Sequence, residues 1–281
     1  MATEPQAAGL PVAWRIPLLV LGLLSMLAGV GAGLQRLGWA VPLPHDSLAT
    51  VHGPLMVAAF FGTVIGLERA VALGKRWGFA APAACGLGGI ALIAGFPPVA
   101  ALTLTTGGAA LLTAVTLCAA RRQPALHTRL LSLAAALSAV AGVAWGFGAT
   151  GLAVAGWMSF LVLTIAGERL ELSRFLPPSP VARRVFVGIV ALLLFALVLT
   201  GRDDAVPGQR LFGFSLALMA LWLLRQDVAR RTARQPGLTG FIARCLLSGY
   251  VWLFSGGLLL AVQPAMPLLM DAALHAVFVG F

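Results

Sequence analysis

Long apolar runs recur along almost the whole chain, and each is long enough to cross a membrane. A transmembrane helix needs about 20 apolar residues to span a hydrocarbon core of about 30 Å. Hydrophobic residues make up 60% of the 281 residues and charged residues only 10%, whereas a soluble domain carries about a quarter charged residues. This pattern predicts a single polytopic, all-α integral membrane domain over residues 1–281.

The apolar runs predict a bundle of about ten transmembrane helices. Proline-rich segments such as 177–180 separate several of them, because proline disfavours continued helix. The 33 glycines allow neighbouring helices to approach closely in lipid. The expected spans are 14–34, 47–73, 78–96, 98–120, 128–149, 151–173, 182–201, 208–225, 239–263 and 267–281.

Basic residues alternate between the two ends of these spans. All but three of the 19 lysines and arginines lie at the N-terminus or in the loops after spans two, four, six and eight. The positive-inside rule then places the N-terminus in the cytoplasm. We expect a multi-pass protein of a bacterial-type cytoplasmic (inner) membrane. The exceptions, on the opposite side, are Arg36, Arg202 and Arg210.

The tenth span is short. From Pro267 to Phe281 it offers about 15 residues, or about 22 Å of helix, and it has no polar or basic anchor at its end. This favours the front part of a longer, twelve-helix chain that is cut within its tenth helix. The alternative is a short final helix in a locally thinned bilayer.

The basic residues do not predict nucleic-acid binding, despite a net charge of +10. They lie in short loops and form no stripe with interleaved aromatics. The three cysteines lie in apolar segments without a CxxCH pattern, which gives no support to a zinc site or a covalently attached haem.

Two histidines inside apolar spans are the main candidates for function, because ionisable groups are costly in lipid. His52 and His275 lie about 8 and 12 Å below the predicted outer ends of spans two and ten. Two imidazoles at one depth could bind a haem iron from both faces. Asp271 precedes His275 by four residues and so shares its helix face, where it could orient the ring. The alternative is that each histidine bonds only to a nearby carbonyl.

Other polar residues suggest structural roles. His45 and His127 fall in expected loops and are interpreted as solvated. Glu68–Arg69 and Glu168–Arg169 end spans two and six in similar segments, which predicts neutralised charge pairs at the inner interface. Their spacing is compatible with three pseudo-repeats of four helices.

The stretch from Thr50 to Met56, T-V-H-G-P-L-M, resembles helix two of haem-copper oxidase subunit I, whose histidine binds the low-spin haem. Asp271 to Gly280 looks more loosely like helix ten of that family. Size and helix number are closer to the NnrS-type haem-binding membrane proteins, which are linked to nitric-oxide tolerance. The resemblance implies one b-type haem (haem b) with His52 and His275 as iron ligands, supported by Asp271 and Met56.

The chain departs from the oxidases at the copper site. Spans six and seven contain no histidine, so the resemblance implies that oxygen reduction is lost. The expected function is electron transfer, or a response to nitric oxide or respiratory stress, with the lipid bilayer and a redox protein as partners. The alternatives are a transporter with a polar path at Asp271, His275 and His52, and a non-catalytic scaffold or assembly factor.

Overall fold

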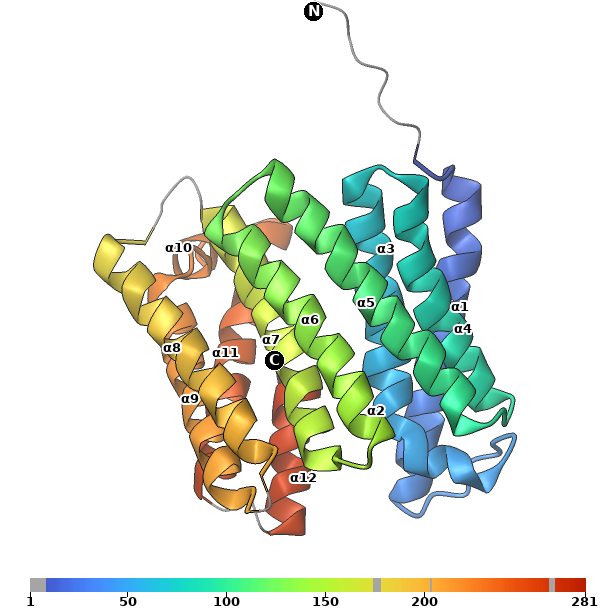
Figure 1. Cartoon of the computed structure of the whole chain (residues 1–281). Coiled ribbons are helices and arrows are strands. Elements are labelled where there is room, and N and C mark those ends of the chain that lie inside the picture. Colours follow the sequence, from blue (N-terminus) through green and yellow to red (C-terminus); the bar gives the residue numbers. More distant parts are fainter. Residues whose placement is uncertain (1–8, 174–177, 203, 263–265) are drawn as a thin grey trace, which may run out of the picture. The chain divides into compact units, whose positions relative to one another are not determined.

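The computed structural model describes residues 9–173, 178–202, 204–262 and 266–281, which are helical with short connections (Figure 1). Nine helices among these residues are long and apolar enough to cross a membrane, and a shorter apolar helix, Pro267–Gly280, follows. The predicted all-α membrane bundle is confirmed. Observed and expected bounds differ by at most three residues, as for span 128–149 against Leu126–Gly146.

The chain forms two compact units, Met1–Leu163 and Thr164–Phe281. In the first unit, successive long helices run up and down beside one another (Figure 1). Its elements are α1 (Val12–Arg36), η1 (Asp46–Val51), α2 (His52–Pro54), η2 (Leu55–Phe61), α3 (Gly62–Leu73), η3 (Arg76–Phe79), α4 (Ala80–Ile93), α5 (Pro98–Arg122), α6 (Leu126–Gly146) and most of α7 (Thr150–Leu172).

The second unit starts within the last turns of α7. The two helices that follow α7 are joined by a hydrogen bond. The indole Nε1–H of Trp222 donates to the carbonyl oxygen of Ala182 at 2.9 Å. Its elements are α8 (Pro180–Thr200), α9 (Val206–Gln226), α10 (Ala229–Thr232), α11 (Gly237–Val262), α12 (Pro267–His275) and η5 (Ala276–Gly280).

Local sequence explains where the helices begin and end. The backbone N–H of Ala182 donates to the Ser179 hydroxyl at 3.2 Å, so Ser179 caps α8, and Pro180 occupies the first turn. Proline is tolerated there because its missing N–H would have no helical partner. Gly74 ends α3 with a φ of +71°, a left-handed conformation that glycine adopts without steric cost.

The backbones of α9 and α11 touch. A methyl group on Gly213 would lie 2.5 Å from the carbonyl oxygen of Gly257, and one on Gly257 would lie 2.7 Å from the backbone nitrogen of Ala217. Only hydrogen fits at such a contact, which is how small residues bring helices together in membranes. This contact fixes the two helices that carry the polar cluster described below.

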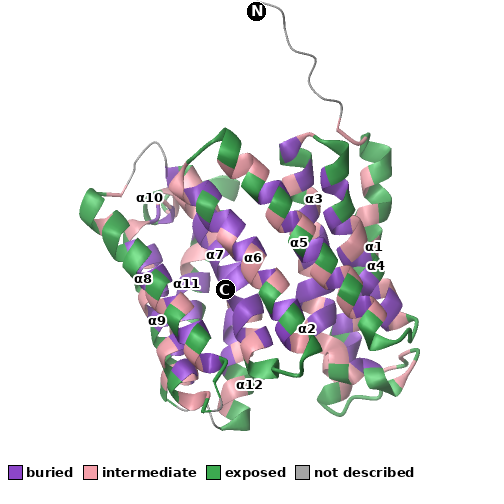
Figure 2. Cartoon of the chain, in the orientation of Figure 1, coloured by how far each residue is buried: buried purple, intermediate pink, exposed green. Residues whose placement is uncertain are grey.

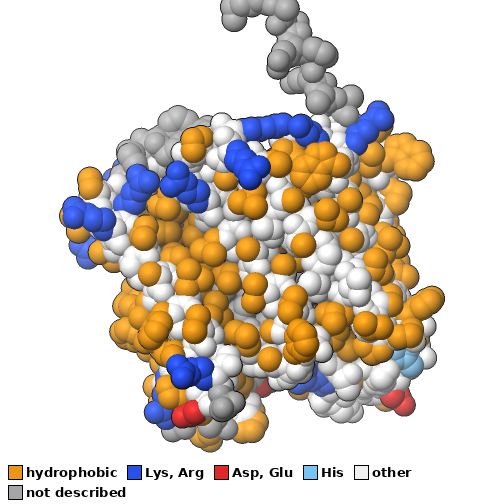
Figure 3. Space-filling model, viewed as in Figure 1, with side chains coloured by type: hydrophobic (Ala, Val, Ile, Leu, Met, Phe, Trp, Pro, Cys, Tyr) orange, Lys and Arg blue, Asp and Glu red, His pale blue; other side chains and the backbone are white. Residues whose placement is uncertain are grey.

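The exposed surface has the distribution expected of a membrane protein. Buried residues follow the inward sides of the helices, and exposed residues lie at loops and outward flanks (Figure 2). Hydrophobic side chains cover these flanks, whereas lysine and arginine gather near helix ends (Figure 3). Lipid can solvate the exposed apolar side chains that water would disfavour.

Candidate functional site

His52 begins α2 in the first unit, between two leucines that are completely buried. Leu48 and Leu55 have no exposed surface and belong to the same apolar cluster. The imidazole packs against α1, where a methyl group on Gly33 would lie 2.9 Å from the ring carbon Cε1. This predicted site residue therefore lies in an apolar setting at a close helix contact.

One ring nitrogen of His52 is already engaged. The carbonyl oxygen of Gly29 lies 2.7 Å from Nδ1, and because a carbonyl can only accept, Nδ1 must carry the proton. Nε2 then holds the lone pair, and it has no hydrogen-bond partner among the described residues. This donor set fits a metal ligand, whose second nitrogen ordinarily donates to a carbonyl or carboxylate.

Met56 lies one turn further on and packs on the same part of α1. A methyl group on Gly29 would lie 2.7 Å from its sulfur atom. Gly29 thus contacts the thioether of Met56 through its Cα and accepts the hydrogen bond of His52 through its carbonyl. The structure brings these two predicted site residues to one α1 position.

His275 ends α12 in the second unit and has a similar hydrogen bond. Its Nδ1 lies 2.9 Å from the carbonyl oxygen of Asp271 and 3.5 Å from the Asp271 carboxylate. The nearer acceptor is therefore the backbone, rather than the carboxylate that the sequence suggested. Nε2 again has no partner within the described ranges. The ring is accessible, with 57% of the side chain exposed.

A π-helical segment follows each of these histidines. It covers Leu55–Phe61 after His52 and Ala276–Gly280 after His275. π-Helical turns are rare and occur frequently at functional sites, because the wider turn shifts side chains and frees backbone groups. Sequence periodicity did not reveal either segment.

Of the other two histidines, His45 differs from this pair, whereas the Nε2 of His127 also has no hydrogen-bond partner among the described residues. In His45, Nε2 donates to the carbonyl of Leu92 at 3.1 Å and Nδ1 accepts from the Ser47 hydroxyl at 2.6 Å, so both nitrogens are used. The expectation that His127 is solvated is wrong, because it lies in the first turn of α6 with 9% exposure. No group of three His, Cys, Asp or Glu side chains is placed to hold a metal ion in the part of the chain described.

The second unit contains a buried polar cluster that could not be identified from the sequence. Asp227, just after α9, has a fully buried side chain. Both its oxygens accept hydrogen bonds from Arg169 on α7, each at 2.8 Å. The Tyr250 hydroxyl on α11 and the backbone N–H of Ala229 also donate to it. Burial raises the pKa of Asp227, but the hydrogen bonds from Arg169 and Tyr250 outweigh burial and hold that pKa below its ordinary value.

The expected charge pairs are partly confirmed. Arg69 donates to Glu68 at 3.0 Å, as the sequence suggested. Arg169 instead forms its two-pronged ion pair with Asp227, 58 residues away. Asp227 is the acidic residue within an arginine-rich loop, and Tyr250 is the single tyrosine of the chain; these were the signals available.

Comparison with known proteins gives one result. A family model described as Domain of unknown function (DUF8744) matches residues 15–281. No curated protein and no solved structure matches the chain.

Proposed function

Because the chain belongs to the DUF8744 family, we propose a function from its own residues: it binds one b-type haem in the membrane through His52 and His275. The protein would serve electron transfer or a response to nitric oxide or respiratory stress. The resemblance of the Thr50–Met56 stretch to a haem-binding helix motivates this proposal. We also propose that both rings bind the same iron atom.

The main support for this proposal is that both imidazole rings are held as the tautomer that is protonated on Nδ1. In each, a backbone carbonyl faces Nδ1 and Nε2 keeps its lone pair. An axial haem ligand needs a neutral imidazole that donates Nε2 to iron, and a hydrogen bond to Nδ1–H orients the ring and raises its basicity. His45 has both nitrogens engaged, so this arrangement is not general to the histidines of the chain.

The surroundings favour the same assignment. His52 lies against the buried apolar cluster that contains Leu48 and Leu55, and an apolar shell limits water around a redox centre. Met56 supports the site by packing on Gly29, whose carbonyl orients His52. The Asp271 carboxylate, at 3.5 Å from His275 Nδ1, supplies a negative charge close to the second ring.

The bound haem would supply one-electron redox chemistry. Because His52 and His275 would both hold the iron, the bound haem would serve electron transfer or sensing rather than oxygen chemistry. The residues of this chain would orient the two rings, exclude water and set the potential.

A visible spectrum of the detergent-purified protein, expressed with ample haem, tests the proposal. We expect sharp reduced α and Soret bands that are lost in His52→Ala and weakened or shifted in His275→Ala. His45→Gln and His127→Ala are matched controls that remove the other two histidines and should keep the bands. A colourless wild-type protein would contradict haem ligation by this pair. Loss of the absorption bands in the control variants, to the same extent as in His52→Ala, would also contradict it.

We also propose the orientation that the charges favour, with the N-terminus in the cytoplasm of a bacterial-type inner membrane. The support is the gathering of basic residues in alternate loops. Alkaline phosphatase fused after Arg202 should then be active outside, whereas a fusion after Gln235 should be inactive. The reverse pattern would invert the topology and leave the haem proposal untouched.

A further inference from the structure

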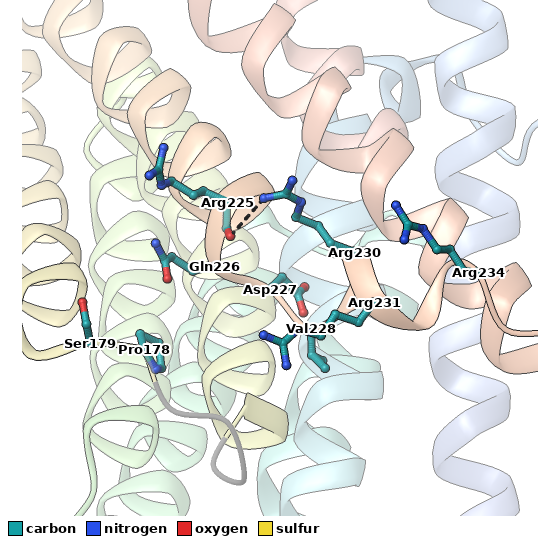
Figure 4. A pocket seen from close by; sticks show the side chains of 9 residues that line it. All are labelled: Pro178, Ser179, Arg225, Gln226, Asp227, Val228, Arg230, Arg231 and Arg234. Atoms are coloured by element: carbon teal, nitrogen blue, oxygen red, sulfur yellow. Dashed lines mark hydrogen bonds between the residues drawn. The ribbon is translucent and has the colours of Figure 1, made fainter.

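An arginine-rich pocket lies in the second unit, between the end of α9 and the start of α8 (Figure 4). Its volume is about 610 Å³. Four arginines line it from the end of α9 and the α10 region, and Ser179, the cap of α8, lies at its other side. The arginines are Arg225, Arg230, Arg231 and Arg234.

Asp227 is the acidic residue in this lining, and it does not neutralise the arginines. Its side chain has no exposed surface. Its oxygens already accept hydrogen bonds from Arg169, Tyr250 and the Ala229 N–H. Two carboxylate oxygens offer about four acceptor positions, so this carboxylate has no capacity left for the pocket.

The arginine side chains of the pocket have no carboxylate partner among the described residues. Arg230 donates to the backbone carbonyl of Arg225 at 3.5 Å, the dashed line in Figure 4. For Arg225, Arg231 and Arg234, no acceptor of a side-chain hydrogen bond is found in the described part of the chain. Four arginines therefore line one pocket without an internal counter-ion among the described residues.

The floor of the pocket is held firmly. The Asp227 carboxylate accepts hydrogen bonds from Arg169 of α7 and Tyr250 of α11. It also accepts one from the backbone N–H of Ala229, the first residue of α10. The segment that carries the arginines thus begins at a fixed point. Preorganised donors lose less entropy when they bind an anion than freely moving ones.

We infer that this pocket binds a phosphate group. Guanidinium groups present planar pairs of donors that match phosphate oxygens, and such charge-assisted hydrogen bonds are about twice as strong as neutral ones. Basic pockets at the ends of transmembrane helices bind phospholipid head groups. The phosphate can belong to an anionic lipid or to a soluble molecule, since both present the same oxygens. This inference does not depend on haem binding.

Titration of the full chain in maltoside detergent at low salt tests the inference, with thermal stabilisation as the readout. Three probes separate the sources: dihexanoyl phosphatidylglycerol, dihexanoyl phosphatidylcholine and inorganic phosphate. We expect saturable binding of phosphatidylglycerol, of inorganic phosphate, or of both, and at least tenfold weaker binding of phosphatidylcholine, whose choline offsets the charge.

Two double variants with equal loss of charge identify the pocket. Arg231→Gln/Arg234→Gln should weaken binding at least tenfold, since loss of even one of the two charge-assisted contacts has about that effect. Arg121→Gln/Arg129→Gln removes two exposed arginines at the ends of α5 and α6 and should change affinity less than twofold. If the first variant does not fold, Arg231→Lys/Arg234→Lys replaces it and should bind at least threefold more weakly, because lysine lacks the planar fork.

Each result decides between outcomes. Binding of phosphatidylglycerol alone identifies a lipid head group, binding of inorganic phosphate alone identifies a soluble ligand, and binding of both supports a site for the phosphate group itself. The inference is overturned if no probe saturates, if both Gln variants lose affinity equally, or if the lysine variant binds like the wild type.

Discussion

The Tyr250 hydroxyl donates a hydrogen bond to the Asp227 carboxylate, and both side chains are buried. Tyr250 lies within α11, and Asp227 follows the last residue of α9. Arg169 of α7 binds the same carboxylate. Three helices of the second unit therefore meet at one carboxylate, and each of its partners can be removed separately.

We predict that Asp227→Asn destabilises the second unit strongly. The change leaves the Arg169 guanidinium, whose side chain is only 14% exposed, without its counter-charge. Breaking a buried ion pair from one side costs about 3–5 kcal/mol. Thermal unfolding in detergent should show a midpoint lower by about 5–15 °C. A shift below about 2 °C would mean that solvent stabilises the Arg169 guanidinium in place of the lost carboxylate.

Tyr250→Phe should be milder. It removes one donor from a carboxylate that keeps its other hydrogen bonds, and it retains the ring that lies 6.1 Å from the ring of Phe281. The expected loss is about 1–2 kcal/mol, measured by the same unfolding assay. If Tyr250→Phe were as damaging as Asp227→Asn, the tyrosine rather than the ion pair would dominate the cluster.

The stability of the folded protein should fall at acidic pH because Asp227 becomes protonated. Its pKa is lowered in the folded protein by hydrogen bonds from Arg169 and Tyr250 that outweigh burial. The ionised carboxylate therefore stabilises the fold above its ordinary pKa of about 4. This contribution is lost as the pH falls below that value and through the folded pKa. Unfolding midpoints measured from pH 7 to pH 3 should fall more for the wild type than for Asp227→Asn, so that the gap between the two proteins narrows. A constant gap would exclude Asp227 as the titrating group.

The contact between α9 and α11 predicts a large effect of a small substitution. Gly213→Ala places a methyl group 2.5 Å from the Gly257 carbonyl oxygen and 2.5 Å from the Ala261 nitrogen. The helices must separate, at a cost of about 1–3 kcal/mol or more. Gly188→Ala in α8 is the matched control, because nothing lies within 4 Å of its added methyl group; it should be neutral or slightly stabilising. Equal stability of the two variants in detergent would contradict the close contact.

For the proposed haem site, Asp271→Ala should retain the reduced bands. The nearest acceptor of His275 Nδ1 is the Asp271 carbonyl, which the substitution keeps, and the carboxylate lies further away at 3.5 Å. Loss of the negative charge should raise the midpoint potential measured by redox titration, since the oxidised iron carries more positive charge. Complete loss of the spectrum would mean that the carboxylate, rather than the backbone, holds the ring.

The membrane helices could be predicted from sequence because the apolar runs and their proline and glycine breaks are local signals. The short tenth helix after Pro267 followed from the same signals. The Asp227 cluster could not be predicted, since Arg169 has a glutamate as its chain neighbour and the partner it selects lies 58 residues away. The π-helical turns after His52 and His275 also leave no periodic trace. Residue identity suggested the two histidines, but only coordinates reveal that a backbone carbonyl faces Nδ1 in both.

The backbone contact between Gly213 and Gly257 also limits how the second unit can change shape. Helices that touch through their main chains cannot rotate or slide against each other without a clash. Any opening of this unit must therefore carry α9 and α11 as one rigid piece, with Asp227 and Tyr250 fixed relative to one another.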